Sequence, residues 1–194
     1  MILTLLRHGK TEASLRRLYC GSTDLPLCAE GIDELKTRWA GRELPAGALY
    51  TSGMCRADET LRLLYGERPY AVLSGLRETN FGTFEMRSYE ELKADTAYQA
   101  WLSGDNEANV CPDGESAAQT LARAKAEIEA LIRRDGDAVC ICHGGPIVLL
   151  MRTWFGGQNR YAWTPAHGCG WRVSFDGGVP RSYRIIIPEQ ERKA

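Results

Sequence analysis

The stretch ILTLLRHG, residues 2–9, decides the fold, because a hydrophobic run ends abruptly there in Arg7, His8 and Gly9. A short apolar run bounded by glycine is typical of a β-strand buried on both faces of a parallel sheet. The stretch AVCICHGG, residues 138–145, has the same pattern and leads directly into His143. Two of the three histidines of the chain therefore follow predicted strands and precede glycine.

Helix-like and strand-like patterns alternate between these two strands. Ile32, Leu35 and Trp39 share one helical face, and residues 115–133 predict a longer amphipathic helix. Two further strands are predicted over residues 48–52 and 70–74. Alternation of strands and helices predicts an α/β protein with a mostly parallel central sheet, covered by helices in three α/β/α layers.

The remaining segments depart from this alternation. Trp171, Val173 and Phe175 alternate with polar residues before the turn DGG and the stretch YRIII, so we expect a hairpin at an edge of the sheet. Residues 79–114 are rich in Asn, Asp, Gly and Glu around one helix-like stretch, residues 89–102. We therefore predict one domain over residues 1–194, with a lid or an insertion at about 79–114.

Composition narrows the classes of function. The chain has 24 basic and 25 acidic residues and no basic block, which argues against a nucleic-acid or membrane partner and requires any anion site to be local. No apolar run is long enough for a signal-peptide core or a membrane span. Seven cysteines without CxxC spacing predict reduced thiols in a cytoplasmic protein.

The two histidines that end strands predict an anion-binding site. In doubly wound sheets, ligands bind beyond the carboxyl ends of the strands, where His8 and His143 lie, and Arg7 is adjacent. The alternative for either histidine alone is an incidental loop residue. Cys140 and Cys142 share one strand face beside His143, but no second cluster completes a four-ligand zinc site, so core thiols are expected. The third histidine, in AHGCG, is expected to be a loop residue outside the site.

Six sequence blocks follow one another along the chain: RHGKTEAS (7–14), GSTDLPLCAEG (21–31), TSGMCRADETL (51–61), LRETNFGTFE (76–85), PDGES (112–116) and CHGGPI (142–147). Together they resemble the histidine phosphatase superfamily, also called phosphoglycerate mutase-like, which has a three-layer fold. Within the superfamily, the short length and the second block are most similar to the α-ribazole phosphatases, which serve cobalamin synthesis.

The resemblance implies a role for each of five residues. His8 corresponds to the nucleophile that becomes phosphohistidine, and Glu78 to the general acid that protonates the leaving alkoxide and later helps water attack. Arg7, Arg56 and His143 correspond to the phosphate-binding groups, and guanidinium forks match phosphate geometry. An imidazole attacks only when neutral, a state that adjacent arginines favour.

The same resemblance places Ser14, Gly21 and Gly144 at the substrate. Ser14 stands where the family usually has Asn and has a shorter reach than an amide. Arg16 and Arg17 follow the first block closely enough to touch the non-phosphate part of a substrate, and a solvated basic pair is the alternative.

The sequence therefore predicts a phosphomonoesterase that acts through phosphohistidine on a small phosphorylated metabolite, with no metal or cofactor. α-Ribazole 5′-phosphate is the candidate substrate. A phosphoglycerate mutase and a non-catalytic phospho-ligand-binding protein are the alternatives. Hydrolysis is favoured over transfer, because Thr79, Asn80 and Phe81 follow Glu78 where mutases usually carry Arg and Tyr. The oligomeric state stays open, with a homodimer as one alternative.

Overall fold

A six-stranded sheet forms the centre of the part of the chain that the structure, a computed structural model, describes. That part comprises residues 1–104, 107–157 and 160–186, with only the backbone at 160 and 161. The strands are β1 (Ile2–Arg7), β2 (Ala48–Thr51), β3 (Ala71–Val72), β4 (Ala138–Cys142), β5 (Gly170–Asp176) and β6 (Val179–Ile186). Their order is β3-β2-β4-β1-β5-β6. Parallel pairing joins β3, β2, β4 and β1, and β5 runs antiparallel to β1, so the sheet is mostly parallel as predicted.

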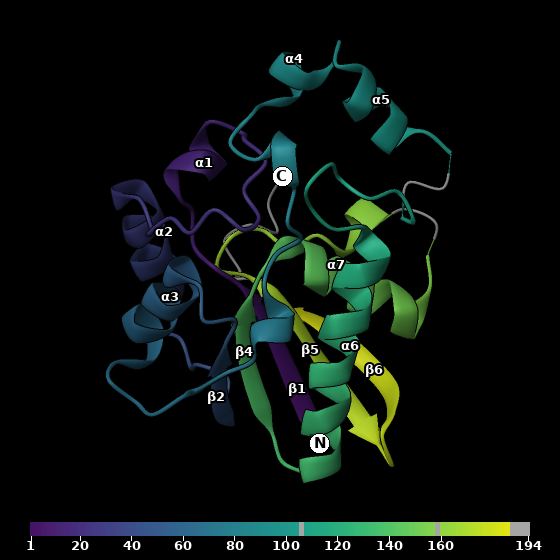
Figure 1. Cartoon of the computed structure of the whole chain (residues 1–194). Helices are drawn as coiled ribbons and strands as arrows, with labels where there is room; N and C mark the ends of the chain where they lie inside the picture. Colours follow the sequence, from purple (N-terminus) through teal and green to yellow (C-terminus); the bar gives the residue numbers. More distant parts are fainter. Residues whose placement is uncertain (105–106, 158–159, 187–194) are drawn as a thin grey trace.

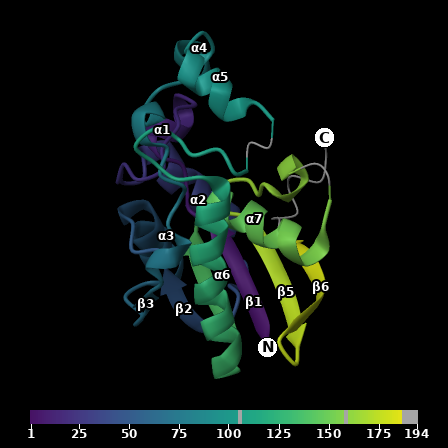
Figure 2. The ribbon, with the colours of Figure 1, turned by 45° about the vertical axis from the view of Figure 1, so that its right-hand side comes forward.

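Helices cover both faces of the sheet (Figures 1 and 2). One face packs against α2 (Ala29–Trp39) and α3 (Cys55–Tyr65), and the other packs against α6 (Ala117–Arg134) and α7 (Gly144–Phe155). Side chains of β1 alternate between the two cores, as a strand requires. This arrangement confirms the three-layer α/β/α prediction. None of the described helices combines the length and the apolar character that crossing a bilayer requires.

Two element boundaries differ from the sequence prediction for local reasons. Helix α6 begins after Ser116, whose hydroxyl accepts from the amide of Gln119 while the Gln119 side chain accepts from the amide of Ser116. This capping box starts the helix two residues later than predicted. The strand predicted over 70–74 is wrong beyond β3, because the chain turns into the 3₁₀ helix η1 (Ser74–Leu76).

Two segments outside the parallel part of the sheet were also predicted. The C-terminal hairpin is confirmed, and β6 forms the edge of the sheet. The single helix predicted over 89–102 is wrong, since the chain forms α4 (Tyr89–Leu92) and α5 (Thr96–Leu102) instead. The Asp95 carboxylate accepts from the amides of Ala97 and Tyr98, so α5 has an N-cap of its own.

Residues 79–114 have a small core of their own, which we call the satellite core. Its buried members are Phe84, Leu92, Tyr98 and Cys111. This segment contains η2 (Gly82–Phe84), and its helices α4 and α5 lie beyond the carboxyl ends of the parallel strands (Figure 1). Tyr19, which follows α1 (Glu12–Leu15), ties this core to the body through a 2.6 Å hydrogen bond between the hydroxyls of Tyr19 and Tyr98. Motion of the segment as a lid stays a prediction.

Four of the seven cysteines, Cys111, Cys140, Cys142 and Cys169, are buried, whereas Cys20, Cys28 and Cys55 are partly exposed. Cys140 and Cys142 are free thiols, fully buried in the core beneath α6 and α7. Burial raises the pKa of the Cys142 thiol to about 12, so this thiol stays protonated and does not behave as a thiolate ligand.

Candidate active site

The register of the sheet brings the two strand-ending histidines together. Arg7 pairs with Cys142 in the parallel ladder between β1 and β4, so the next residues, His8 and His143, are neighbours. The amide of His8 donates to the carbonyl of Cys142 at 3.0 Å, and the two imidazole centroids are 5.0 Å apart. Ser52 follows the adjacent strand β2 and completes a row of side chains at this edge.

His8 is held as a neutral imidazole. Its Nδ1–H donates to the carbonyl of Gly9 at 2.6 Å, which leaves the lone pair on Nε2. Burial lowers the pKa of His8 well below its ordinary value, and its electrostatic interactions with His143 and Arg56 lower it further. Arginines alone were expected to favour the neutral form, but burial is the larger cause. The geometry therefore supplies a nucleophilic nitrogen at ordinary pH.

Arg56, in the first turn of α3, has a fully buried guanidinium fixed by backbone carbonyls. Nη1 donates to Thr23 O at 2.9 Å and Nη2 to Gly21 O at 2.8 Å. Gly21 is needed here because a Cβ at this position would overlap the carbonyl of Thr79. The structure therefore places Gly21 behind Arg56, where its peptide orients the guanidinium.

His143 is also neutral in this arrangement. The Nε of Arg56 donates to His143 Nδ1 at 3.3 Å, so Nε2 carries the proton and donates to the hydroxyl of Ser52 at 2.8 Å. Burial and the charge of Arg56 lower the pKa of His143 well below its ordinary value. A proton arriving at Nδ1 would convert His143 into a donor toward an anion.

Arg7 has a buried donor that no described residue satisfies. Its Nη1 donates to Pro165 O at 3.0 Å, whereas its Nε has no partner within the described part of the chain. A buried N–H without a partner is costly, and an oxyanion is the natural acceptor for a guanidinium. Gly144 lies against this guanidinium, where a Cβ would be 3.4 Å from both Cζ and Nε.

Glu78 is held at the start of α7. Its carboxylate oxygens accept from the amide of Thr79 at 2.9 Å and from the amide of Gly145 at 3.0 Å. A Cβ on Gly145 would overlap this carboxylate, so the glycine lets Glu78 approach the backbone of the helix. The structure thus brings Glu78 to the same edge of the sheet as His8 and His143.

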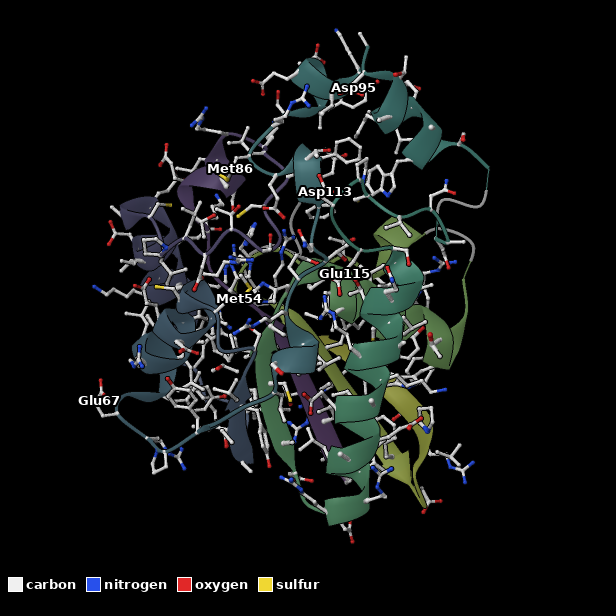
Figure 3. All side chains as sticks on the ribbon, viewed as in Figure 1. Met54, Glu67, Met86, Asp95, Asp113 and Glu115 are labelled. Atoms are coloured by element: carbon white, nitrogen blue, oxygen red, sulfur yellow. The ribbon has the colours of Figure 1, made fainter. Side chains whose placement is uncertain are left out.

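The backbone that carries Glu78 is clamped by Arg123 of α6. The Arg123 guanidinium donates to the carbonyls of Gly75, Arg77 and Glu78, at 2.8, 2.6 and 2.8 Å. It also forms a bidentate pair with the Glu115 carboxylate, with both distances 2.9 Å. Figure 3 shows Glu115 near the N-terminal end of α6. One side chain therefore fixes the position of the predicted acid through its main chain.

Two cavities meet at these residues. The first, of about 280 Å³, we call the phosphate cavity; it is lined by Arg7, His8, Thr11, Ser14, Arg17, Leu18, Cys20, Arg56, Glu78 and His167. The second, of about 250 Å³, we call the apolar cavity; it is lined by Arg7, Glu78, Thr79, Phe81, Ala117, Gly144, Gly145, Val148, Leu149 and Thr164. Arg7 and Glu78 line both cavities and so lie between them.

His167 is the site residue that sequence reasoning missed. It was predicted to be a loop residue outside the site, but the structure places its ring centroid 5.3 Å from that of His8. Its Nδ1 donates to the carbonyl of His8 at 3.0 Å, and burial lowers its pKa to about 3. A signal was present in the sequence, because all three histidines of the chain precede glycine.

The nitrogen-containing side chains of the site are guanidinium groups and imidazoles. Among the described residues, no group of three or more His, Cys, Asp or Glu side chains is arranged to hold a metal ion.

Comparison with known proteins identifies the family. The model of the histidine phosphatase superfamily (branch 1) matches residues 3–183. The chain belongs to this superfamily. The predicted histidine phosphatase resemblance and the phosphoglycerate mutase-like fold are both confirmed.

Relatives of this histidine phosphatase carry two kinds of name. An adenosylcobalamin/alpha-ribazole phosphatase of Salmonella typhimurium (strain LT2) is 33% identical over 162 residues, which cover 78% of each chain. A 2,3-bisphosphoglycerate-dependent phosphoglycerate mutase of Xanthobacter autotrophicus is 30% identical and covers 78% of this chain and 80% of its own. The crystal structure of the alpha-ribazole phosphatase from Shigella flexneri superposes with a TM-score of 0.83, at 25% identity over 96% of both chains.

Proposed function

We propose that this histidine phosphatase hydrolyses a small phosphate monoester through a phosphohistidine on His8. The observation that carries the proposal is the phosphate cavity itself. It contains a buried neutral imidazole with a free Nε2, next to a buried Arg7 Nε without a partner in the described chain and the fixed guanidinium of Arg56. A non-catalytic binding protein needs the arginines but has no need for a nucleophile and an acid beside them.

In the first half-reaction, Nε2 of His8 attacks phosphorus and the bond between phosphorus and the ester oxygen breaks. The Glu78 carboxyl group gives its proton to the departing alkoxide. Arg7 and Arg56 stabilise the negative charge on the equatorial oxygens as it develops. The same negative charge favours uptake of a proton from solvent at His143 Nδ1, which then donates to the phosphoryl group while Nε2 stays with Ser52, and this proton returns to solvent when phosphate leaves.

In the second half-reaction, the Glu78 carboxylate accepts a proton from water as the water oxygen attacks phosphorus. The bond between phosphorus and Nε2 breaks, the electron pair returns to His8, and inorganic phosphate leaves. His8 and Glu78 are then in their initial protonation states. The hydrogen bond from Nδ1 to the Gly9 carbonyl stabilises the imidazolium character that Nε2 phosphorylation creates.

We take α-ribazole 5′-phosphate as the substrate to test first. The relative from Salmonella typhimurium and the structure from Shigella flexneri carry α-ribazole phosphatase in their names. The apolar cavity supports this choice, because Phe81, Val148 and Leu149 line it next to Glu78, where the leaving group departs. An aromatic base on the leaving group would bury apolar surface there. Arg7 is the single cation among the residues that line the apolar cavity, and it already binds the phosphoryl group. The apolar cavity therefore has no cation left for the second anionic group that a mutase substrate carries, which favours hydrolysis over phosphoryl transfer.

The substrate is a small molecule in this proposal, and the free thiols of Cys140 and Cys142 support a reducing, cytoplasmic setting.

Quenched-flow labelling tests the proposal. With EDTA present throughout, wild-type protein mixed with α-ribazole 5′-phosphate or with 3-phosphoglycerate should release inorganic phosphate, faster from the former. Wild-type protein quenched during turnover should also carry an acid-labile, base-stable phosphate on His8. His8→Ala should show neither label nor turnover, and Lys125→Ala, on the exposed side of α6, should behave as wild type. Near-normal turnover by His8→Ala, or 2-phosphoglycerate as the main product, would contradict the proposal.

A further inference from the structure

Arg17 is a cavity-lining cation that the proposed mechanism does not use. It lines the phosphate cavity together with Arg7, His8 and Arg56. Unlike those three residues, Arg17 is exposed, and its guanidinium forms no hydrogen bond or ion pair within the described ranges. Its neighbour Arg16 is equally exposed but does not line the cavity and lies near Glu91 instead.

The backbone at Arg17 is strained in a way that favours glycine. Its φ is +54°, in the left-handed region, and it follows the C-cap of α1. The amide of Arg17 donates to Ser14 O, and the amide of Leu18 donates to Ala13 O, the pattern that usually ends a helix with glycine. A side chain in this conformation has a conformational cost. Strain of this kind at a ligand cavity suggests that the side chain has a function.

The charges in the cavity indicate what that function is. Arg7, Arg56 and the protonated His143 together offset the two negative charges of a bound phosphoryl group and the carboxylate of Asp24, which lies 3.9 Å from Arg56 Nη1. Glu78 must be protonated when it acts as the acid, so it adds no negative charge at that stage. The charge of Arg17 is then unmatched until the substrate supplies a further anion.

We propose that Arg17 binds a second oxyanion, a carboxylate or a phosphate, on the leaving-group part of the substrate. This inference rests on the proposed function and adds to it that, of two esters with the same nucleoside leaving group, the one with a further oxyanion near the ester is preferred. The substrate class is then still a phosphorylated nucleoside, and Arg17 discriminates among its members by a second acidic group near the ester without taking part in bond cleavage.

A matched pair of esters tests the role of Arg17. Adenosine 3′,5′-bisphosphate and adenosine 5′-monophosphate differ only in the second phosphate, and release of the 5′-phosphate is measured for both. Wild type should prefer the bisphosphate, and Arg17→Gly should reduce this preference in kcat/KM by about fivefold to fiftyfold, as expected for one partly exposed ionic contact. Arg17→Lys should keep part of the preference, and Arg16→Ala should keep all of it. High salt should weaken the preference in wild type.

Two further measurements separate specificity from structure. Because glycine relieves the left-handed strain, Arg17→Gly should raise Tm while it lowers the preference. Hydrolysis of preformed phosphohistidine should proceed at the wild-type rate, because the leaving group has already departed. If wild type turns over neither adenosine ester, calorimetric binding of the two compounds gives the same ratio.

Several results would overturn the inference. Equal losses on both esters would mean that Arg17 contacts the reactive phosphate, and an unchanged ratio would mean that it is a solvated surface charge. Turnover of p-nitrophenyl phosphate tests the proposed function separately, because this ester has no second anion. Failure of that turnover with intact selectivity in binding would refute the hydrolytic mechanism and leave the role of Arg17 standing.

Discussion

At the scale of the residue, the role of Glu78 depends on the group that leaves. An alkoxide departing from a sugar phosphate is strongly basic and needs a proton, whereas p-nitrophenolate leaves unaided. Glu78→Gln keeps the shape of the side chain, including an oxygen that can accept from Gly145, and removes the acid. Phosphorylation of His8 by an alkyl ester should therefore slow about 10²-fold to 10⁴-fold, and phosphorylation by p-nitrophenyl phosphate far less.

The comparison must be made on the single-turnover burst, because Glu78 also activates water in the second half-reaction. The amplitude of phosphohistidine formed in the first turnover separates the two steps. Equal losses on both esters in the burst would assign Glu78 to positioning and would require another acid.

Most of the candidate residues could be predicted from the sequence, because sequence blocks carry Arg7, His8, Arg56, Glu78 and His143. The electrostatics could not. Burial is the main reason that His8 is neutral, and burial arises from packing of distant segments. His167 was missed for the same reason, since a histidine far along the chain reaches His8 only after β5 pairs with β1.

At the scale of the element, α6 acts on the site through Arg123. A guanidinium contacts three carbonyls and the Glu115 carboxylate at once, and an ammonium cannot reproduce this fork. Arg123→Lys should therefore lower kcat for an alkyl ester about tenfold, as expected for loss of charge-assisted hydrogen bonds that position the acid. Turnover of p-nitrophenyl phosphate should change much less.

Lys125→Ala, two residues further along the same helix, is the matched control, because Lys125 is exposed and pairs only with Glu129 among the described residues. Its rates should equal those of wild type. Equal losses on both esters for Arg123→Lys would show a general loss of structure rather than a displaced acid.

Helices and strands with a strong hydrophobic periodicity could be predicted from the sequence, and those with a weak periodicity could not. The runs of β1 and β4 and the amphipathic face of α6 depend on local patterns that the fold keeps. The division of residues 89–102 into α4 and α5 depends instead on whether Asp95 caps a separate second helix or lies inside one continuous helix. Packing of Tyr98 into the satellite core favours the first choice, and no local pattern contains that information.

At the scale of the whole molecule, the three histidines make the free energy of unfolding depend on pH. All three have a lower pKa in the folded protein than in the unfolded chain, chiefly through burial. Above about pH 6.5 they are neutral in both states and contribute nothing to the dependence on pH. Below that pH the unfolded chain binds more protons, so the free energy of unfolding should fall by about 1.4 kcal/mol per pH unit for each histidine. For His167 the fall should continue to about pH 3.

Urea unfolding at a series of pH values measures this slope. His167→Asn removes one of the groups, so its slope between about pH 6 and 4 should be smaller by about 1.4 kcal/mol per pH unit. Between pH 7 and 8 the slopes of variant and wild type should agree, which is an internal control. Identical slopes in the acidic range would show that His167 is protonated in the folded state.

The satellite core has a consequence for how such a protein can diversify. Residues that perform the chemistry extend from strands of the main sheet and its flanking helices, whereas Phe81, on the wall of the apolar cavity, packs against a separate small core. Insertions or repacking within residues 79–114 can therefore reshape the wall that meets the leaving group without disturbing β1 or β4. Substrate specificity depends on the satellite core and the catalytic step on the main sheet. Mutations in one of these regions can therefore change one property during evolution and leave the other almost unaffected.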